Sequence, residues 1–269
     1  MEMVRVREYF LKTILILDIG NTNITCGICY DGKITQKWRI LSDLGKNAYE
    51  YYLQIEHYIT NIRIDFISIS SVVPQISIII KKMIEEHIHT PHIFVNSSTE
   101  LGLKFQMPDP SFIGADLIVN AFIAKEKYKA NCIIIDLGTA TTIQLVGGDG
   151  VFYGTVIIPG VHTSTKSIIE KAAQLKDFEF NVPENTLGLH TTQSLSLGII
   201  RGHAFTIDGF VENIKKEYAN LKDIKVIMTG GVAEMIFKYT KNVDVFDEDL
   251  QIEGLGMIGE NYCDSLPIQ

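Results

Sequence analysis

The stretch ILILDIGNTNITCGI, residues 14–28, decides how this sequence is interpreted. An apolar run ends at Asp18, and Gly20 and a polar trio at residues 21–23 follow it. Alternation of apolar and small residues then resumes. This pattern predicts a β-hairpin with a tight polar turn.

Such a turn presents backbone N–H groups and hydroxyls to an anion, with one carboxylate beside them. Because a carboxylate repels a phosphate unless a cation lies between them, Asp18 suggests a metal–phosphate site with a largely hydrated Mg²⁺. Gly20 allows the backbone to approach a ligand closely. The alternative is an ordinary hairpin in which Asp18 and Gly20 only form the turn.

The same design recurs in CIIIDLGTATTIQLV, residues 132–146. A constant offset of 118 residues pairs Asp18 with Asp136, Gly20 with Gly138, Asn21 with Thr139 and Asn23 with Thr141. A repeat at a domain-sized interval indicates two similar domains, each offering a phosphate-facing hairpin to a shared cleft.

Two further motifs have both a structural and a functional interpretation. Asp116 ends the run IGAD directly before a helical pattern, where aspartate commonly caps a helix. The helix dipole would also keep this carboxylate ionised, so that it could accept the proton of a substrate hydroxyl during phosphoryl transfer. Thr229-Gly230-Gly231 separates an apolar run from a helical pattern, which suits a simple turn or the close approach of a flat ligand.

The composition limits the function classes. The chain of 269 residues has a formal net charge of −8, which argues against a general binder of nucleic acid or anionic membranes. No apolar run approaches the ~20 residues of a membrane span. The first dozen residues mix charges throughout and lack a signal-peptide core. Residues 1–13 are interpreted as either an extension or a misassigned start. These features predict a cytoplasmic protein with reduced cysteines.

Two short motifs resemble metal sites but are interpreted as structural. The spacing of Cys26 and Cys29 places their sulfurs on opposite faces of a strand, and no second such pair exists. His87, His89 and His92 have no nearby cysteine that would complete a metal site, so we interpret them as a solvated connector.

Paired DxGxT hairpins resemble those of the sugar kinase, heat-shock chaperone and actin superfamily. The ordered set DIGNTN, SSVVP, GAD, DLGTATT, PGV, TGG and EGL resembles the type III pantothenate kinase family over nearly the whole chain from Ile14. The resemblance implies an α/β fold with two ribonuclease H-like (actin-like ATPase) domains, residues 1–128 and 129–269, around a shared nucleotide cleft. The first domain should have the order β-β-β-α-β-α-β.

The resemblance also implies an activity and its residues. The reaction is ATP-dependent phosphorylation of the pantothenate hydroxyl to 4'-phosphopantothenate, the first step of coenzyme A biosynthesis, with Asp116 as the catalytic base. Asp18 would hold Mg²⁺ through water, and Asp136 would bind K⁺ or NH₄⁺. The implied ATP-binding residues are Asp18, Ile19, Gly20, Asn21, Thr22, Asn23, Ile24, Thr25, Thr139, Gly230 and Gly231. The implied pantothenate-binding residues are Met107, Gly114, Ala115, Asp116, Leu117 and Thr191. The family is homodimeric.

Two positions depart from the family pattern. Leu117 stands where the family usually has an arginine that contacts substrate, and Met107 stands where it has an aromatic residue. Another residue could compensate, the affinity could be low, or the substrate could be another small alcohol. A non-catalytic nucleotide-binding regulator is the other alternative. Retention of Asp18, Asp116 and Asp136 favours a kinase, since a regulator does not need the base.

Overall fold

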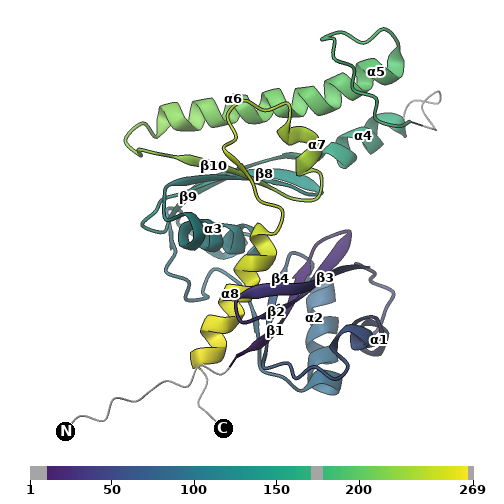
Figure 1. Cartoon of the computed structure of the whole chain (residues 1–269), viewed down its shortest axis with the longest axis vertical. Helices are drawn as coiled ribbons and strands as arrows, with labels where there is room; N and C mark the ends of the chain where they lie inside the picture. The colour runs from purple at the N-terminus through teal and green to yellow at the C-terminus, as the bar shows by residue number, and fades with distance from the viewer. Residues whose placement is uncertain (1–10, 171–177, 266–269) are drawn as a thin grey trace. The chain divides into compact units, whose positions relative to one another are not determined.

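The computed structural model describes residues 11–170 and 178–265, so most of the expected extension lies outside the described residues (Figure 1). The described chain forms two compact units. The first comprises the chain up to Asn96, with Gly114–Asp116 and the segment from Ile252 onward. The second comprises Ser97–Ile113 and Leu117–Gln251.

The first unit contains a five-stranded sheet of order β3-β2-β1-β4-β5, in which β1, β2 and β3 are antiparallel and β4 and β5 run parallel to β1. Two helices connect the later strands, and the second continues as a π-helical turn at Ile84–Ile88. The expected order β-β-β-α-β-α-β is therefore confirmed. The bounds are β1 (Thr13–Ile19), β2 (Asn23–Tyr30), β3 (Lys33–Leu41), α1 (Ala48–Ile59), β4 (Phe66–Ser71), α2 (Pro74–Met83) and β5 (His92–Phe94).

Local sequence explains where these helices begin. Asn47 and Glu50 form a reciprocal capping box at the start of α1. Pro74 occupies the first turn of α2, where its missing N–H has no helical partner anyway. The apolar faces of both helices pack on one face of the sheet, which includes Leu15 and Leu17 of β1.

The opposite face of the first sheet is covered by α8 (Leu250–Ser265), the yellow helix in Figure 1. Its glycines permit this approach, because a Cβ on Gly259 would collide with Ile14 and one on Gly256 would lie 3.1 Å from the Cys29 sulfur. Residues of β1 therefore alternate between two covered faces, as the period of a strand requires.

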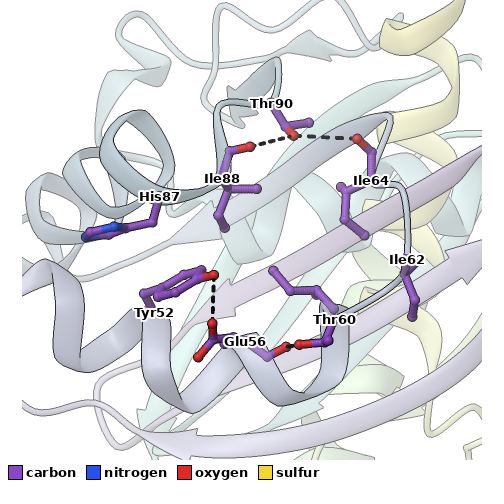
Figure 2. A pocket seen from close by; sticks show the side chains of 9 residues that line it. Tyr52, Glu56, Thr60, Ile62, Ile64, His87, Ile88 and Thr90 are labelled. Carbon is purple, nitrogen blue, oxygen red and sulfur yellow. Dashed lines mark hydrogen bonds between the residues drawn. The ribbon is translucent and has the colours of Figure 1, made fainter.

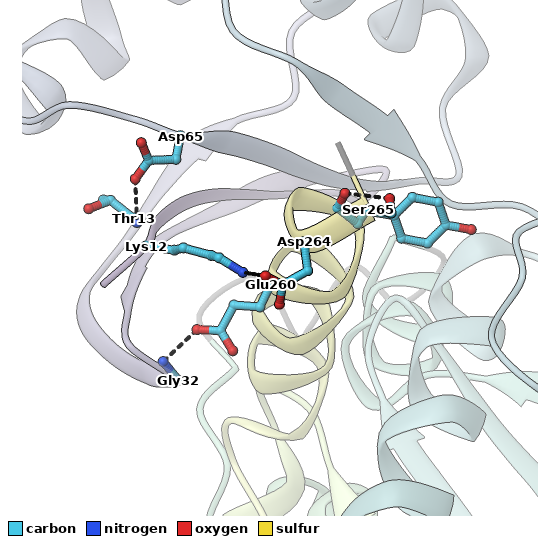
Figure 3. Close-up of polar contacts among 8 residues, drawn as sticks. Lys12, Thr13, Gly32, Asp65, Glu260, Asp264 and Ser265 are labelled. Carbon is cyan, nitrogen blue, oxygen red and sulfur yellow. Dashed lines mark hydrogen bonds and ion pairs between the residues drawn. The ribbon is translucent and has the colours of Figure 1, made fainter. Parts of the chain in front are cut away.

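Polar contacts fasten the second half of α8 to the strands (Figure 3). The Gly32 N–H donates to Glu260 Oε1 at 2.5 Å, and Lys12 forms an ion pair with Asp264. These contacts join the helix to the β2–β3 turn and to the chain just before β1.

The second unit contains a six-stranded sheet of order β11-β10-β7-β8-β9-β6. Leaving out β6, its order repeats that of the first sheet. One face packs on α6, which includes the buried residues Ile207 and Val211, and the other packs on α3. The bounds are β6 (Lys104–Phe105), α3 (Ala115–Tyr128), β7 (Cys132–Leu137), β8 (Ala140–Val146), β9 (Val151–Pro159), α4 (Val161–Ile169), α5 (Thr191–Ser196), α6 (Gly202–Glu217), β10 (Lys225–Thr229), α7 (Ala233–Phe237) and β11 (Val245–Phe246).

Each sheet thus receives one covering helix from the other half of the sequence. From Leu117 onward α3 belongs to the second unit, and from Ile252 onward α8 belongs to the first. The compact units consequently cross the boundary at residue 128 that the repeat suggested. The cause is that packing of these two helices, rather than the position of the repeat, decides which sheet they join.

Two segments of the second unit depart from regular helix and loop. Residues 104–112 contain β6, which pairs parallel with β9, and a 3₁₀ turn at Pro110–Phe112. A π-helical segment at Leu197–Arg201 connects α5 to α6. None of the helices in the described part of the chain has the length and apolar character needed to cross a membrane.

Candidate active site

Asp18 lies near the carboxyl end of β1, opposite Thr25 on β2 and Ser70 on β4. Its side chain is half-buried among these small hydroxyl residues. Burial, with a smaller contribution from the Asp18 charge, raises the pKa of the adjacent Cys26 thiol, so that thiol stays neutral. A half-buried carboxylate at a strand end, with no bulky neighbour in the sheet, is suited to hold a hydrated cation.

The first turn follows at residues 20–23. The Gly20 N–H donates to the Asn23 carbonyl at 3.0 Å, and a Cβ on Gly20 would lie 3.1 Å from the same oxygen. The Ser42 hydroxyl donates to the Gly20 carbonyl at 2.6 Å. Asn21 and Thr22 are exposed at the tip of the turn.

Asp116 lies in the first turn of α3 and belongs to the first unit, like Asp18. The Val72 N–H, just after β4, donates to the Ile19 carbonyl at 3.0 Å. A Cβ on Gly114 would lie 3.5 Å from Val72 and would collide with the Asp116 carboxylate. Consecutive contacts therefore lead from the end of β1 to the carboxylate of Asp116 within one compact unit.

Asp136 occupies the matching place in the second sheet, opposite Thr142 on β8 and Thr229 on β10. The Asn120 side-chain amide donates to Asp136 Oδ2 at 2.9 Å. Gly230 has a φ of +101°, and a Cβ there would lie 2.7 Å from Asp136 Oδ1. Glycine is consequently required where the end of β10 meets this carboxylate.

The second turn is held from another direction by the start of α4. The Thr139 carbonyl accepts hydrogen bonds from the Thr163 hydroxyl at 2.6 Å and from the Gly160 N–H at 3.2 Å. A Cβ on Gly160 would lie 2.5 Å from the Gly138 carbonyl oxygen. Gly138 and Thr139 themselves are exposed.

The two turns differ in length by one residue. The first spans residues 20–23 and the second spans 138–140 between their paired strands. The offset of 118 residues therefore holds on the first strand of each hairpin and becomes 117 on the second. The expected pairing of Asn23 with Thr141 is wrong, because Ala140 takes that place.

Thr141 instead forms a buried hydrogen bond that the sequence analysis missed. Its hydroxyl lies 2.9 Å from Nε2 of His203 on α6, and burial lowers the pKa of His203. The one available signal was the position of His203 within the buried stripe of the helix.

The residues expected to bind pantothenate are divided between the units. Gly114, Ala115 and Asp116 belong to the first unit, whereas Met107, Leu117 and Thr191 belong to the second. Met107 is half-buried after β6, and Thr191 is exposed at the start of α5. Leu117 is only 6% exposed, and its carbonyl accepts a hydrogen bond from the Gln144 side chain at 3.0 Å. Leucine at this position is therefore a packing residue of α3.

The expectation that the Cys26 and Cys29 sulfurs lie on opposite faces of a strand is confirmed. Cys26 packs in the core under α1 and α2, whereas Cys29 faces α8 at Gly256, so the sulfurs lie on opposite faces of β2. All four cysteines are free, and burial raises the pKa of Cys29 to about 12. No group of three or more His, Cys, Asp or Glu side chains suited to a metal occurs within the described ranges.

The expectation of a solvated histidine connector is wrong for His87 (Figure 2). Its ring stacks on Tyr52, with centroids 5.0 Å apart, and its Nε2 atom is buried. The π-helical turn that follows α2 brings it against α1. A cavity of about 290 Å³ adjoins it, lined also by Ile62 and Ile64. These residues precede β4, whereas Ser70 lies near its carboxyl end, so this cavity is separate from the Asp18 turn.

Two sheets of the same strand order, each with an acid-and-glycine turn between its central strands, give the chain the two-domain ribonuclease H-like fold of the actin-like ATPases and sugar kinases. Solved structures support this fold: a protein assigned to the Baf family of transcriptional activators from Campylobacter jejuni has a TM-score of 0.58 at 17% identity, over 93% of this chain and 99% of that one. MreB5 of Spiroplasma citri bound to ADP has a TM-score of 0.56 at 11% identity, over 94% and 98% of the two chains. A ROK family glucokinase from Streptomyces griseus has a TM-score of 0.52 at 13% identity, over 93% and 99%.

Sequence comparison identifies the family. Residues 14–213 match the profile of the type III pantothenate kinases. A type III pantothenate kinase from Agathobacter rectalis is 34% identical over 250 residues, which cover 91% of this chain and 96% of that protein. The chain belongs to the type III pantothenate kinase family. Its reaction is ATP-dependent phosphorylation of pantothenate in coenzyme A biosynthesis, with a divalent metal ion.

Proposed function

We propose that the two acid-and-glycine turns bind the phosphates of one ATP molecule and that Asp116 activates the pantothenate hydroxyl. The observation that supports this best is the position of Asp116. It starts a helix, and consecutive contacts through Gly114 and Val72 connect it to the end of β1. A base must lie close to the phosphates to accept a proton from the attacking hydroxyl.

The first turn would carry the metal–phosphate part of the reaction. Asp18 would hold Mg²⁺ through water, while Ile19 to Thr25 provide backbone N–H groups and small polar side chains for the β- and γ-phosphates. The exposure of Asn21 and Thr22 supports this role, because a ligand can reach them. Mg²⁺, when bound, would neutralise charge that develops on the transferred phosphoryl group.

The second turn would carry the monovalent cation and the nucleoside. Asp136, with the neighbouring backbone carbonyls, offers the oxygen ligands suited to K⁺ or NH₄⁺. Thr139 would contact phosphate. Gly230 and Gly231 would let the backbone approach adenosine, in keeping with the positive φ of Gly230.

Pantothenate would contact Met107, Gly114, Ala115, Leu117 and Thr191. Because the Leu117 side chain is buried, we propose that it contributes through its backbone and that its position provides no cation for the pantothenate carboxylate. We further propose a homodimer, testable by light scattering on the purified protein, and a cytoplasmic location, in keeping with four free thiols.

The test of this function is Asp116→Asn, which keeps the shape of the side chain and removes the base. Pantothenate phosphorylation should fall by about 10²- to 10⁴-fold, while the affinity for ATP, measured by calorimetry, should change little. Asp109→Asn is the matched control, since Asp109 caps the nearby 3₁₀ turn by accepting from Ser111 N–H at 2.9 Å. Wild-type turnover in folded Asp116→Asn would contradict the assignment of the base.

A further inference from the structure

The amide of Asn120 contacts the carboxylate of the second turn from inside the protein. Asn120 lies on α3 and is fully buried, and its Nδ2 donates to Asp136 Oδ2 at 2.9 Å. The other oxygen, Oδ1, lies on the side of Gly230, where a Cβ would approach it to 2.7 Å. The orientation of the carboxylate is therefore fixed with one oxygen toward the helix and one toward the end of β10.

The other end of the same amide is not satisfied. Asn120 Oδ1 is buried and has no hydrogen-bond partner among the described residues. A buried acceptor without a partner lowers stability, so an apolar side chain would suit this helix position better if packing were its only role. What the asparagine adds is a hydrogen bond to an ionised group, and such bonds are stronger than those between neutral groups.

We propose that Asn120 is a positioning residue for the kinase reaction, which holds the Asp136 carboxylate in the orientation that binds the monovalent cation. It acts through Asp136 and contacts neither ATP nor pantothenate. This inference rests on the proposed role of Asp136. Residues that orient metal ligands in this way commonly change metal affinity about 10- to 100-fold when they are replaced.

Asn120→Leu tests the proposal, because leucine has a similar volume and no donor. The concentration of K⁺ that gives half-maximal pantothenate phosphorylation should rise about 10- to 100-fold, with a smaller change in turnover at saturating K⁺. A second measurement does not depend on activity: K⁺, compared with equal choline, should raise the Tm of the wild type and not that of Asn120→Leu. Should the leucine variant fail to fold, Asn120→Ser, whose shorter hydroxyl cannot replace the amide, should show the same loss.

Gln144→Leu is the matched control. Gln144 is likewise a buried amide between α3 and the sheet, and its Oε1 has no partner within the described part of the chain. Its Nε2, however, donates to the Leu117 carbonyl. It should lose stability while keeping the half-maximal K⁺ concentration and the K⁺-dependent rise in Tm. An equal loss of K⁺ response in Gln144→Leu would mean that Asn120 acts only through general stability.

Asp136→Asn separates failure of this inference from failure of the proposed function. If the wild type and Asp136→Asn respond equally to K⁺, the role proposed for Asp136 is wrong. If Asp136→Asn loses the K⁺ response and both Asn120 variants keep it, the role of Asp136 stands and the inference about Asn120 is wrong.

Discussion

The two acid-and-glycine turns have the same place in their sheets but are supported differently. The Asp18 turn is four residues long, with its tip exposed, and is held by Ser42, whose hydroxyl donates to the Gly20 carbonyl and whose N–H donates to the Thr22 carbonyl. The turn after Asp136 is one residue shorter and is packed by the backbone at Gly160 and Gly230. This comparison teaches that turns of similar sequence at the same place in two sheets can differ in how closely the surrounding backbone packs against them.

The largest difference between the two turns is expected in turnover when their aspartates, Asp18 and Asp136, are replaced. Asp18→Asn should lower turnover about 10²- to 10³-fold at every K⁺ concentration, because it removes a charge that offsets transition-state charge through the metal. Asp136→Asn should lower turnover to a level that no longer depends on K⁺, because it removes the proposed ligand of the monovalent cation. Steady-state rates over a K⁺ titration would distinguish them, and identical titration curves for the two variants would remove the functional contrast between the turns.

The next largest difference between the turns is expected in the stability cost of replacing their glycines. Gly230→Ala combines a positive φ with a Cβ only 2.6 Å from the Leu137 backbone nitrogen, and it should lower the free energy of unfolding by about 3 kcal/mol. Gly20→Ala meets one carbonyl at 3.1 Å, without a positive φ, so about 1 kcal/mol or less is expected. Urea unfolding of both variants measures this, and a larger loss for Gly20→Ala would reverse the order of rigidity.

The smallest difference in stability is expected between variants that remove the hydroxyl groups supporting each turn. Ser42 and Thr163 each donate to a turn carbonyl at 2.6 Å. Ser42→Ala and Thr163→Val should each cost about 1 kcal/mol. Because the backbone at Gly160 also packs closely against the second turn, Ser42→Ala should weaken ATP binding more than Thr163→Val. Calorimetric titration with ATP checks this, and equal weakening in both variants would argue against the difference in support.

We expect a pH-dependent contribution to stability at the hairpin of the second turn and not at that of the first. Burial lowers the pKa of His203, which is bonded to Thr141, whereas Ile24 occupies the corresponding position of the first hairpin. The unfolded state then binds the proton more tightly than the folded state. The stability contributed by neutral His203 is therefore complete above about pH 6.5 and is lost as the pH falls toward the folded-state pKa. The stability advantage of wild type over His203→Gln should therefore be smaller at pH 5.5 than at pH 8. An advantage that grows in acid would contradict this sign.

Much of the fold follows from sequence because it depends on local pattern. The apolar run before Asp18, the alternation after Asn23 and the recurrence at Asp136 predict both hairpins. The one-residue difference between the turns was not predictable, since register depends on cross-strand pairing rather than on motif letters.

Other features depend on contacts between distant segments. Nothing near residue 250 in the sequence shows that α8 packs on β1, and nothing near Asn120 shows its bond to Asp136. The π-helical turn at Ile84–Ile88, which buries His87 against Tyr52, is likewise a result of packing. The candidate site was predictable as a set of motifs, whereas its supporting residues were not.

The position of α8 has a consequence for how the chain folds while it is being translated. The first sheet is translated early, yet one of its faces stays uncovered until residues beyond 252 have left the ribosome, because chain growth proceeds from the amino terminus. During that interval, apolar side chains such as Ile14 and Ile16 are open to aggregation or to a chaperone. Folding yield in the cell should therefore be more sensitive to changes at Gly259 than the stability of the finished protein suggests.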